Sequence, residues 1–145
     1  MAREVFQYEP LDSEPDVAVG LALPINIVGG KFKSTYTTTD QARTNLKNLL
    51  LTIKGERVFQ PDFGTNLYNI LFEPNTEFLR ENIKEEIKSS ISKWTPYINL
   101  ENINVVGQEN TVRIKIAYTV SPSNFGSSIT LEFDLTTGIS SEIGE

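Results

Sequence analysis

The chain has 145 residues and contains neither cysteine nor histidine, so it lacks a thiol nucleophile, thiolate metal ligands and the commonest general base. Its formal net charge is −6, and its basic residues form no continuous stripe, which argues against nucleic acid as a partner. No apolar run reaches the ~20 residues of a membrane-spanning helix, and the N-terminus lacks the apolar region of a signal peptide. We therefore expect one domain, made in the cytoplasm, that needs no cofactor, metal or membrane.

Residues 1–30 are predicted to form an extended N-terminal arm. The first half of the arm is acidic and interrupted by proline, a composition that fits either disorder or ordering on a partner. The apolar stretch 17–25 is expected to lie on the core or to add a strand, and Gly29 and Gly30 then break the chain. The folded domain is expected over residues 31–137.

Two segments carry apolar residues at helical spacing. The first helix is predicted to begin at Thr39 or Asp40, and its apolar face holds Ala42, Leu46, Leu49, Leu50 and Ile53. A short helix is expected over residues 67–72. The longest helix is predicted to follow a cap at Asn75 or Thr76, and its apolar stripe holds Leu79, Ile83, Ile87, Ile91 and Trp94.

The last third of the chain alternates apolar and polar residues, as half-buried strands do. Strands are predicted over residues 100–106, 112–120 and 129–135, with turns between them. The fold class is therefore α+β, with two main helices packed on a three- or four-stranded antiparallel sheet. Small residues after Thr136 predict a flexible tail over residues 138–145.

The most constrained stretch is the loop between the first two helices. Gly55 and Gly64 permit left-handed backbone near its two ends, and Pro61 restricts the residue before it to extended geometry. Phe59 and Phe63 carry apolar rings, so we expect the loop to fold onto the core.

Three pieces of this region form a recognisable pattern. They read Asn-Leu-Leu-Leu-Thr-Ile-Lys-Gly-Glu-Arg at 48–57, Pro-Asp-Phe-Gly-Thr-Asn-Leu at 61–67 and Leu-Phe-Glu at 71–73. In this order and spacing they resemble the baseplate-wedge and sheath-initiator family of contractile phage tails, which is similar to a baseplate component of type VI secretion systems. The resemblance runs from about Thr38 to Val120. It implies a structural protein of the virion tail baseplate, present in several copies around a symmetric baseplate.

The resemblance also implies three structured surfaces, of which the loop and the turn after the longest helix are the first two. The loop residues expected to matter are Gly55, Glu56, Arg57, Pro61, Phe63 and Gly64. Arg57 is expected to fix the loop by bonding carbonyls or a carboxylate. The family often has Glu-Pro-Arg where this chain has Thr95, Pro96 and Tyr97, and that triplet docks on the wedge core. Here the contact is either lost to a plain helix-ending turn or changed from charge-assisted to aromatic.

The third implied surface is the sheet, which in this family accepts extended arms from the first ring of tail-sheath subunits. The residues expected to take part in this pairing are Val112, Ile114, Ile116, Ile129, Leu131 and Phe133. Which sheet edge is open is left undecided, although only the predicted tail follows the strand at 129–135. The implied partners are the tail sheath protein and the wedge core proteins, with tail tube or hub proteins as further candidates.

The alternative function is hydrolysis of peptidoglycan, because the family's domain name has long carried the word lysozyme. A glycosidase needs two carboxylates, one of them with a raised pKa. Glu56, Asp62 and Glu73 are close in sequence, but a pairing of Glu56 with Arg57 would lower the carboxyl pKa. The sequence therefore favours a structural protein over an enzyme.

Overall fold

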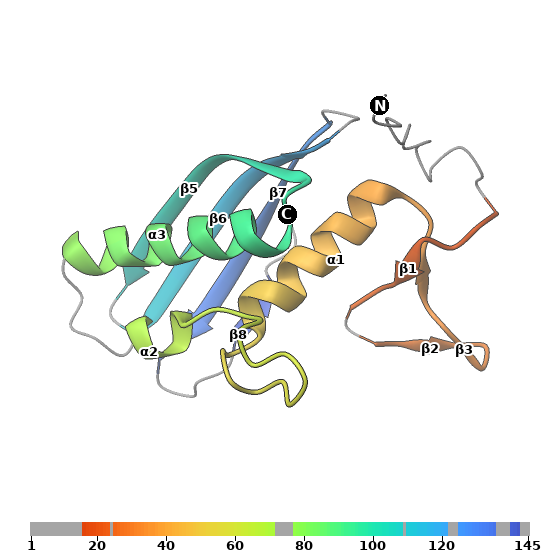
Figure 1. Cartoon of the computed structure of the whole chain (residues 1–145), viewed down its shortest axis with the longest axis horizontal. Coiled ribbons are helices and arrows are strands. Elements are labelled where there is room, and N and C mark those ends of the chain that lie inside the picture. The colour runs from red at the N-terminus through yellow and green to blue at the C-terminus, as the bar shows by residue number, and fades with distance from the viewer. Residues whose placement is uncertain are drawn as a thin grey trace, which may run out of the picture.

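A computed structural model describes the chain over residues 16–23, 25–71, 77–108, 110–121, 125–135 and 140–142. The described part is an α+β fold in which an antiparallel sheet is covered on one face by helices, with a small hairpin unit at one end (Figure 1). None of the helices in these ranges is long and apolar enough to cross a membrane.

The described residues contain three helices and eight strands. The helices are α1 (Thr38–Leu51), α2 (Leu67–Leu71) and α3 (Glu77–Trp94). The main sheet has the order β5-β6-β7-β8 and consists of β5 (Ile98–Gln108), β6 (Thr111–Val120), β7 (Phe125–Asp134) and β8 (Ser140–Glu142). Two small ladders pair β1 (Gly20–Leu21) with β4 (Ser34–Thr35), and β2 (Ile27–Val28) with β3 (Lys31–Phe32).

The core lies between the helices and the sheet face that they cover. The apolar stripes of α1 and α3 supply Ala42, Leu46, Leu49, Leu50, Leu79, Ile83, Ile87 and Ile91. Alternate residues of β6 and β7 point toward them, because successive side chains of a strand alternate between the two faces. The predicted α+β fold with two main helices is confirmed, and the sheet has four strands.

Helix α1 begins and ends at other residues than predicted. The hydroxyl of Thr37 accepts a hydrogen bond from the Asp40 backbone N–H, so the helix begins before the predicted caps. At the other end Thr52 is extended, and Ile53 forms a parallel bridge with Thr65 instead of a further turn of helix.

Two described segments near the chain ends are also more structured than the sequence indicated. Residues 140–142, placed in the flexible tail, form β8 and pair with Leu131–Phe133 of β7. The predicted boundary between arm and domain at residue 30 falls inside the hairpin of β2 and β3. Residues 1–15 of the arm lie outside the described residues.

The loop after α1 is held at its base by backbone hydrogen bonds. The N–H of Thr65 donates to the Thr52 carbonyl at 2.9 Å, and the N–H of Lys54 donates to the Thr65 carbonyl at 3.2 Å. Gly64, which directly precedes Thr65, is buried and has a φ of 112°. A Cβ at Gly64 would overlap the Thr52 carbonyl oxygen. Glycine is therefore required here both for backbone conformation and for space.

The same loop is tied to α3 by one carboxylate. Glu86 Oε1 accepts from Lys54 Nζ at 2.6 Å and from the backbone N–H of Asn66 at 2.9 Å. Burial raises the pKa of this carboxyl, but the hydrogen bonds from Lys54 and Asn66 and the Lys54 charge outweigh it, and the pKa lies below its ordinary value of 4.5. Glu86 therefore stabilises the fold in its charged form.

We expect Gly64→Ala to lower the melting temperature more than Gly55→Ala does. Gly55 also has a positive φ, 96°, but a Cβ there would meet no atom within 4 Å. Backbone strain alone should cost about 1–2 kcal/mol in Gly55→Ala, and the overlap with Thr52 should add to that cost in Gly64→Ala. Thermal unfolding followed by circular dichroism measures both. Equal losses would show that the overlap is relieved at no cost.

Glu86→Gln should lower the free energy of unfolding by about 1 kcal/mol at about pH 7, because the charge-assisted bonds to Lys54 and Asn66 weaken. A lowered folded pKa gives a contribution that is full above the ordinary value and is lost as the pH falls through the folded pKa. The difference from wild type should therefore shrink toward about pH 3 in urea titrations. Glu85→Gln on the exposed face of α3 is the matched control. A difference that stays constant with pH would contradict the assignment.

Candidate functional site

The loop that begins at Gly55 is closed by its own backbone. The N–H of Gly55 donates to the Pro61 carbonyl at 2.8 Å, the N–H of Gln60 to the Arg57 carbonyl at 3.2 Å, and the N–H of Phe63 to the Gln60 carbonyl at 3.0 Å. The positive φ of Gly55 serves the preceding tight turn, which is closed by a hydrogen bond from the Glu56 N–H to the Ile53 carbonyl at 3.2 Å. The loop is therefore a folded structure that presents its tip in a defined position.

Arg57 fixes the loop through aromatic rings. Its guanidinium carbon lies 3.9 Å from the centre of the Phe63 ring, and Phe63 packs edge-on against Trp94 with 5.3 Å between ring centres. Lys93 Nζ lies 5.0 Å from the Trp94 ring. Such cation–aromatic contacts are worth about 0.5–2 kcal/mol each. The contact with Phe63 replaces the bonding to carbonyls or a carboxylate that we expected for Arg57.

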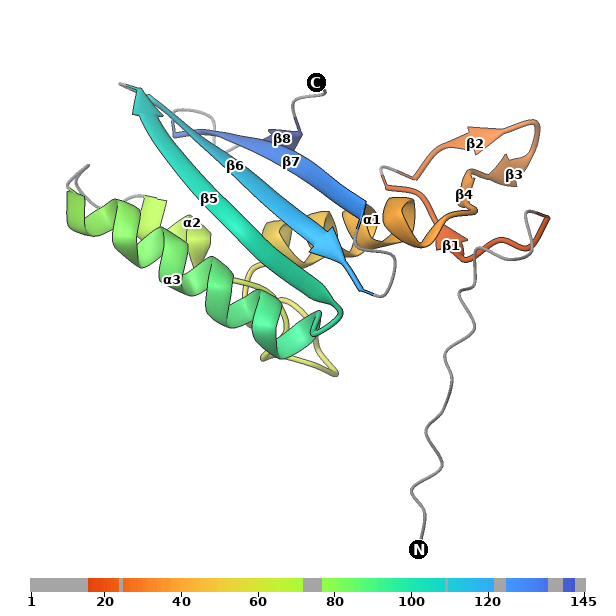
Figure 2. The ribbon, with the colours of Figure 1, turned by 90° about the horizontal axis from the view of Figure 1, so that it is seen from above.

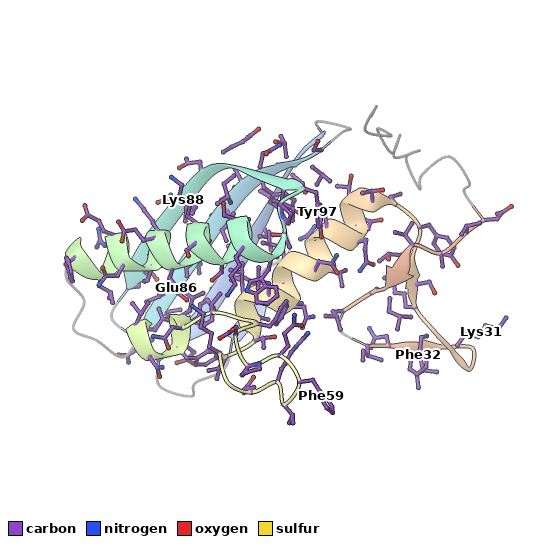
Figure 3. The ribbon with its side chains drawn as sticks, viewed as in Figure 1. Lys31, Phe32, Phe59, Glu86, Lys88 and Tyr97 are labelled. Atoms are coloured by element: carbon purple, nitrogen blue, oxygen red, sulfur yellow. The ribbon has the colours of Figure 1, made fainter. Side chains whose placement is uncertain are left out.

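The tip of the loop is apolar and faces solvent. Val58 is 88% exposed and Phe59 is 101% exposed. Figure 3 shows Phe59 pointing outward from the loop. The prediction that Phe59 packs on the core is wrong, whereas Phe63 is partly buried against the core as expected. No pattern in the sequence separates the two phenylalanines, because both lie in the same irregular segment.

Glu56 caps the turn at the start of the loop. Its Oε2 accepts a hydrogen bond from the backbone N–H of Ile53 at 3.2 Å, and its side chain is exposed. Asp62 is exposed as well, and Glu73 lies outside the described residues. Glu56 thus has a local structural role.

The turn after α3 is largely bound within the fold. Thr95 is buried and its hydroxyl donates to the Ile91 carbonyl at 3.0 Å, which completes the end of the helix. The Tyr97 hydroxyl accepts from Asn45 Nδ2 at 2.9 Å and the side chain is half-buried. Pro96 is exposed. Of the three residues predicted to contact the wedge, only Pro96 offers its side chain freely.

Loop and turn lie together, because Phe63 and Trp94 are in contact. We call residues 56–63 and 94–97 the loop–turn surface. It combines the stacked cation and rings with the exposed apolar tip at Val58 and Phe59. The structure thus joins two predicted sites that are distant in sequence.

The six side chains predicted to take part in sheath pairing belong to the core. They are Val112, Ile114, Ile116, Ile129, Leu131 and Phe133, and each is 3% exposed or less. Strand β6 pairs with β5 on one side and with β7 on the other along its whole length. An added strand therefore cannot reach β6. On β7, the stretch Leu131–Phe133 is covered by β8.

The longest open edge in the described part of the chain is that of β5. This strand has 11 residues, pairs only with β6, and lies at the end of the strand order (Figure 2). Its pairing slips once, between Leu100 and Asn102, and the extra residue Glu101 is the only charged side chain in the strand. Edge strands that avoid pairing usually carry several charges, proline or bulges. Apart from the bulge at Glu101, β5 has none of these, and residues 102–108 present an edge without charge or proline. The lack of charge in most of this strand is the sequence feature that could have identified its edge as open.

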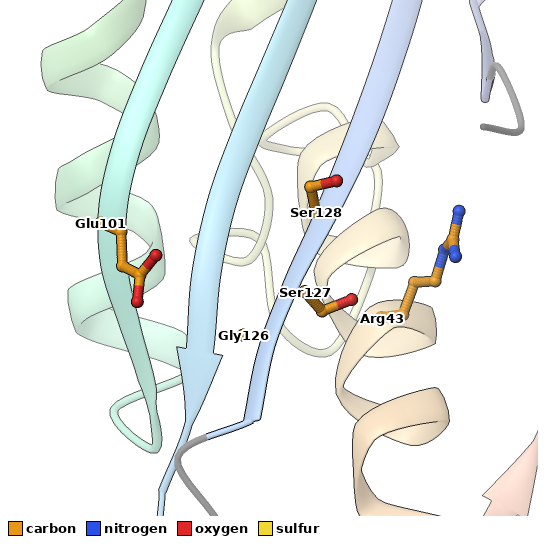
Figure 4. A pocket seen from close by; sticks show the side chains of 5 residues that line it. All are labelled: Arg43, Glu101, Gly126, Ser127 and Ser128. Atoms are coloured by element: carbon orange, nitrogen blue, oxygen red, sulfur yellow. The ribbon is translucent and has the colours of Figure 1, made fainter.

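The two best-formed hollows on the described surface are shallow. One is lined by Arg43 of α1, Glu101 of β5, and Gly126, Ser127 and Ser128 of β7 (Figure 4). A second is lined by Ile70, Asn82, Glu85, Glu86 and Ser89. It holds two carboxylates, but the lowered pKa of Glu86 is the opposite of what a general acid needs. Within the described ranges no three acidic residues are placed to hold a metal ion.

Comparison with known proteins places the chain in a family. The family model described as baseplate wedge protein gp25 matches residues 37–124. Baseplate wedge protein gp25 of Enterobacteria phage T4 is 29% identical over 80 residues, which is 54% of this chain and 61% of that protein. The match therefore spans less than two thirds of that relative.

Solved structures share the fold. A protein from Geobacter sulfurreducens described as a tail lysozyme is 25% identical, with a TM-score of 0.64 over 68% of this chain and 92% of that one. A chain of the anti-feeding prophage baseplate is 22% identical, with a TM-score of 0.63 over 70% of this chain and 83% of that one. A chain of the contracted pyocin R2 baseplate is 19% identical, with a TM-score of 0.56 over 67% and 98%. The last two comparisons concern the fold alone.

The family model covers more than half of the chain, including α1, the loop, α3, β5 and β6. By this match the chain belongs to the baseplate wedge protein gp25 family.

Proposed function

We propose that the chain is a structural component of a contractile-tail baseplate wedge, which joins the wedge core to the first ring of tail sheath and so initiates sheath assembly. Family membership supports the place in the baseplate. The observation that carries the sheath role is the open 11-residue edge of β5. The proposal replaces pairing on β6 and β7 with pairing on β5.

An extended arm from a sheath subunit adds to β5 as a fifth strand. Its backbone then satisfies the N–H and C=O groups that β5 leaves unpaired, which supplies affinity without a deep pocket. The exposed side chains of Asn99, Asn102, Asn104 and Val106 lie along β5 and provide contacts that select the arm. The opposite end of the sheet is less suited, because β8 has only three residues.

The loop–turn surface faces the wedge core in this proposal. Exposed Val58, Phe59 and Pro96 give it an apolar character, and the guanidinium of Arg57 lies beside them over Phe63. Aromatic and arginine side chains are the usual anchors of protein interfaces. The contact is thus aromatic and apolar, where the family's Glu-Pro-Arg triplet is charged. Several copies act around a symmetric baseplate, with tail tube or hub proteins as further neighbours.

Blocking the β5 edge should prevent sheath formation without unfolding the chain. In Asn99→Lys/Asn102→Lys, two lysines are added at exposed positions of β5, opposite the uncharged Thr119 and Ala117 of β6, and charged edges resist strand addition. We expect the variant to enter baseplates, but the fraction of tails with extended sheath should fall at least about tenfold, the effect of losing 1.4 kcal/mol. Electron micrographs of purified tails give that fraction.

The matched control is Ser89→Lys/Ser92→Lys, which adds the same charge to the exposed face of α3. It should form sheath normally. Normal sheath in the β5 variant would overturn the role of this edge, and loss of sheath in both variants would attribute the effect to charge.

A structural role also predicts that the purified chain does not cleave peptidoglycan. Glu56 is engaged with Ile53, and Glu86 has a lowered pKa, so neither meets the requirement for a general acid. Labelled cell walls incubated with the chain should release no more soluble fragments than buffer does. Release that disappears in Glu56→Gln would support the alternative function, hydrolysis of peptidoglycan.

A further inference from the structure

The segment from Val17 to Thr39 contains no acidic residue, although the chain as a whole is acidic. The whole chain has 19 aspartates and glutamates, yet the only charged side chains of this segment are Lys31 and Lys33. Nearly all of the segment lies before residue 37, where the match to the family begins. Its charge is therefore a property of this chain that the family match leaves unexplained.

The segment folds into the paired strands β1 to β4, which we call the basic hairpin (residues 20–36). It projects beyond the start of α1, away from the four-stranded sheet (Figure 2). Each of its two ladders has only two residue pairs. Two-stranded units of this kind are at best marginally stable in water unless they pack against something else.

The exposed apolar residues of the chain are concentrated here. Ten large apolar side chains are exposed in the described ranges, and six of them belong to the hairpin or the residues just before it: Val17, Leu21, Ile25, Ile27, Phe32 and Tyr36. Ile25 and Ile27 are 62% and 68% exposed, and Phe32 is 56% exposed between the two lysines. A cluster of exposed apolar side chains on a small unit marks an interaction surface.

The hairpin is fixed to the body of the protein by polar contacts with α1. The Thr35 hydroxyl donates to Gln41 Oε1, Gln41 Nε2 donates to Asn45 Oδ1 at 2.8 Å, and Asn45 Nδ2 donates to the Tyr97 hydroxyl at 2.9 Å. This chain of amides and hydroxyls links the hairpin to the turn after α3. The exposed side chains are thus held out in a defined position and are not needed for the core.

We propose that the basic hairpin docks on another protein of the baseplate, at an apolar patch bordered by carboxylates. Figure 3 shows Lys31 and Phe32 on the hairpin, away from the body of the protein. In the proposed complex the apolar side chains around Phe32 fill the patch, and Lys31 and Lys33 pair with the carboxylates. Two lysines are too few for an anionic membrane, which is recognised by clusters of about four to eight cations. The inference rests on the proposed function, because it places the partner inside the baseplate.

A photo-crosslinker identifies the partner directly. Benzoylphenylalanine is placed at Phe32 and, as the matched control, at Phe78, which is 69% exposed on α3. Assembled baseplates are illuminated and the crosslinked peptides are sequenced by mass spectrometry. Position 32 should attach to a segment of a different protein that combines aspartate or glutamate with apolar residues, and position 78 should not attach to that segment. Attachment to another copy of this chain, to lipid or to nothing would overturn the proposal.

Reversing the charge of Lys31 and Lys33 tests docking without disturbing the fold. In Lys31→Glu/Lys33→Glu the exposed hairpin meets carboxylates with like charge, so the number of chains per purified baseplate should fall at least about tenfold, the effect of 1.4 kcal/mol. Lys31→Arg/Lys33→Arg should incorporate normally. Both variants should keep the far-ultraviolet circular dichroism and melting temperature of wild type. Normal incorporation of the glutamate variant would overturn the hairpin's role.

The two proposals fail in different ways. The β5 variant enters the baseplate but stops the sheath, whereas the hairpin variant does not enter. If the glutamate variant incorporates and forms sheath while the β5 variant does not, the docking inference falls and the sheath role stands.

Discussion

The structure depends on the close approach of Gly64 to the end of α1. The N–H of Thr65 bonds to the Thr52 carbonyl, the Thr65 hydroxyl bonds to the Leu50 carbonyl at 3.0 Å, and Ser90 of α3 donates to the Gly64 carbonyl at 3.4 Å. These contacts bring the end of one helix, the base of the loop and the middle of the long helix to one point. A side chain on Gly64 would separate them, because it would occupy the space of the Thr52 carbonyl. The loop can be rigid and project outward only because its base is fixed here.

Rigidity of the loop explains why it can carry exposed apolar residues. A flexible segment would lose conformational entropy on binding, whereas a loop closed by hydrogen bonds and by the stack of Arg57 on Phe63 has already lost it during folding. The hairpin follows the same principle through Gln41 and Asn45. In both places polar or stacked contacts hold a segment to the body, and the apolar side chains that remain are available to a partner.

Periodicity in the sequence predicted the two main helices and the three long strands, because these signals depend on burial of one face. It could not predict which strand edges are free, since an edge is a property of backbone pairing and the pattern reports side chains. For that reason Val112 and Ile129, which carry a strong strand pattern, proved to be core residues, and the open edge belongs to β5. The short strand at 140–142 has no apolar alternation and was missed for the same reason. Phe59 was misplaced because composition alone does not give the direction of a side chain within a loop.

The surface features of the described residues are spread over several elements and are not gathered in one cavity. A catalytic site concentrates groups with opposed pKa values in a cavity that excludes water. In the described part of the chain the two best-formed hollows are shallow, and the one carboxyl there with a shifted pKa, Glu86, is engaged in holding the loop. The features with no role inside the fold are an unpaired edge, an apolar loop tip and an acid-free hairpin, and they lie on different elements. A protein that must touch several neighbours at once needs separate surfaces of this kind, because each partner approaches from its own direction. The shared core then sets the angles between those surfaces, and the stability of the Gly64 contact becomes a condition for the geometry of the whole assembly.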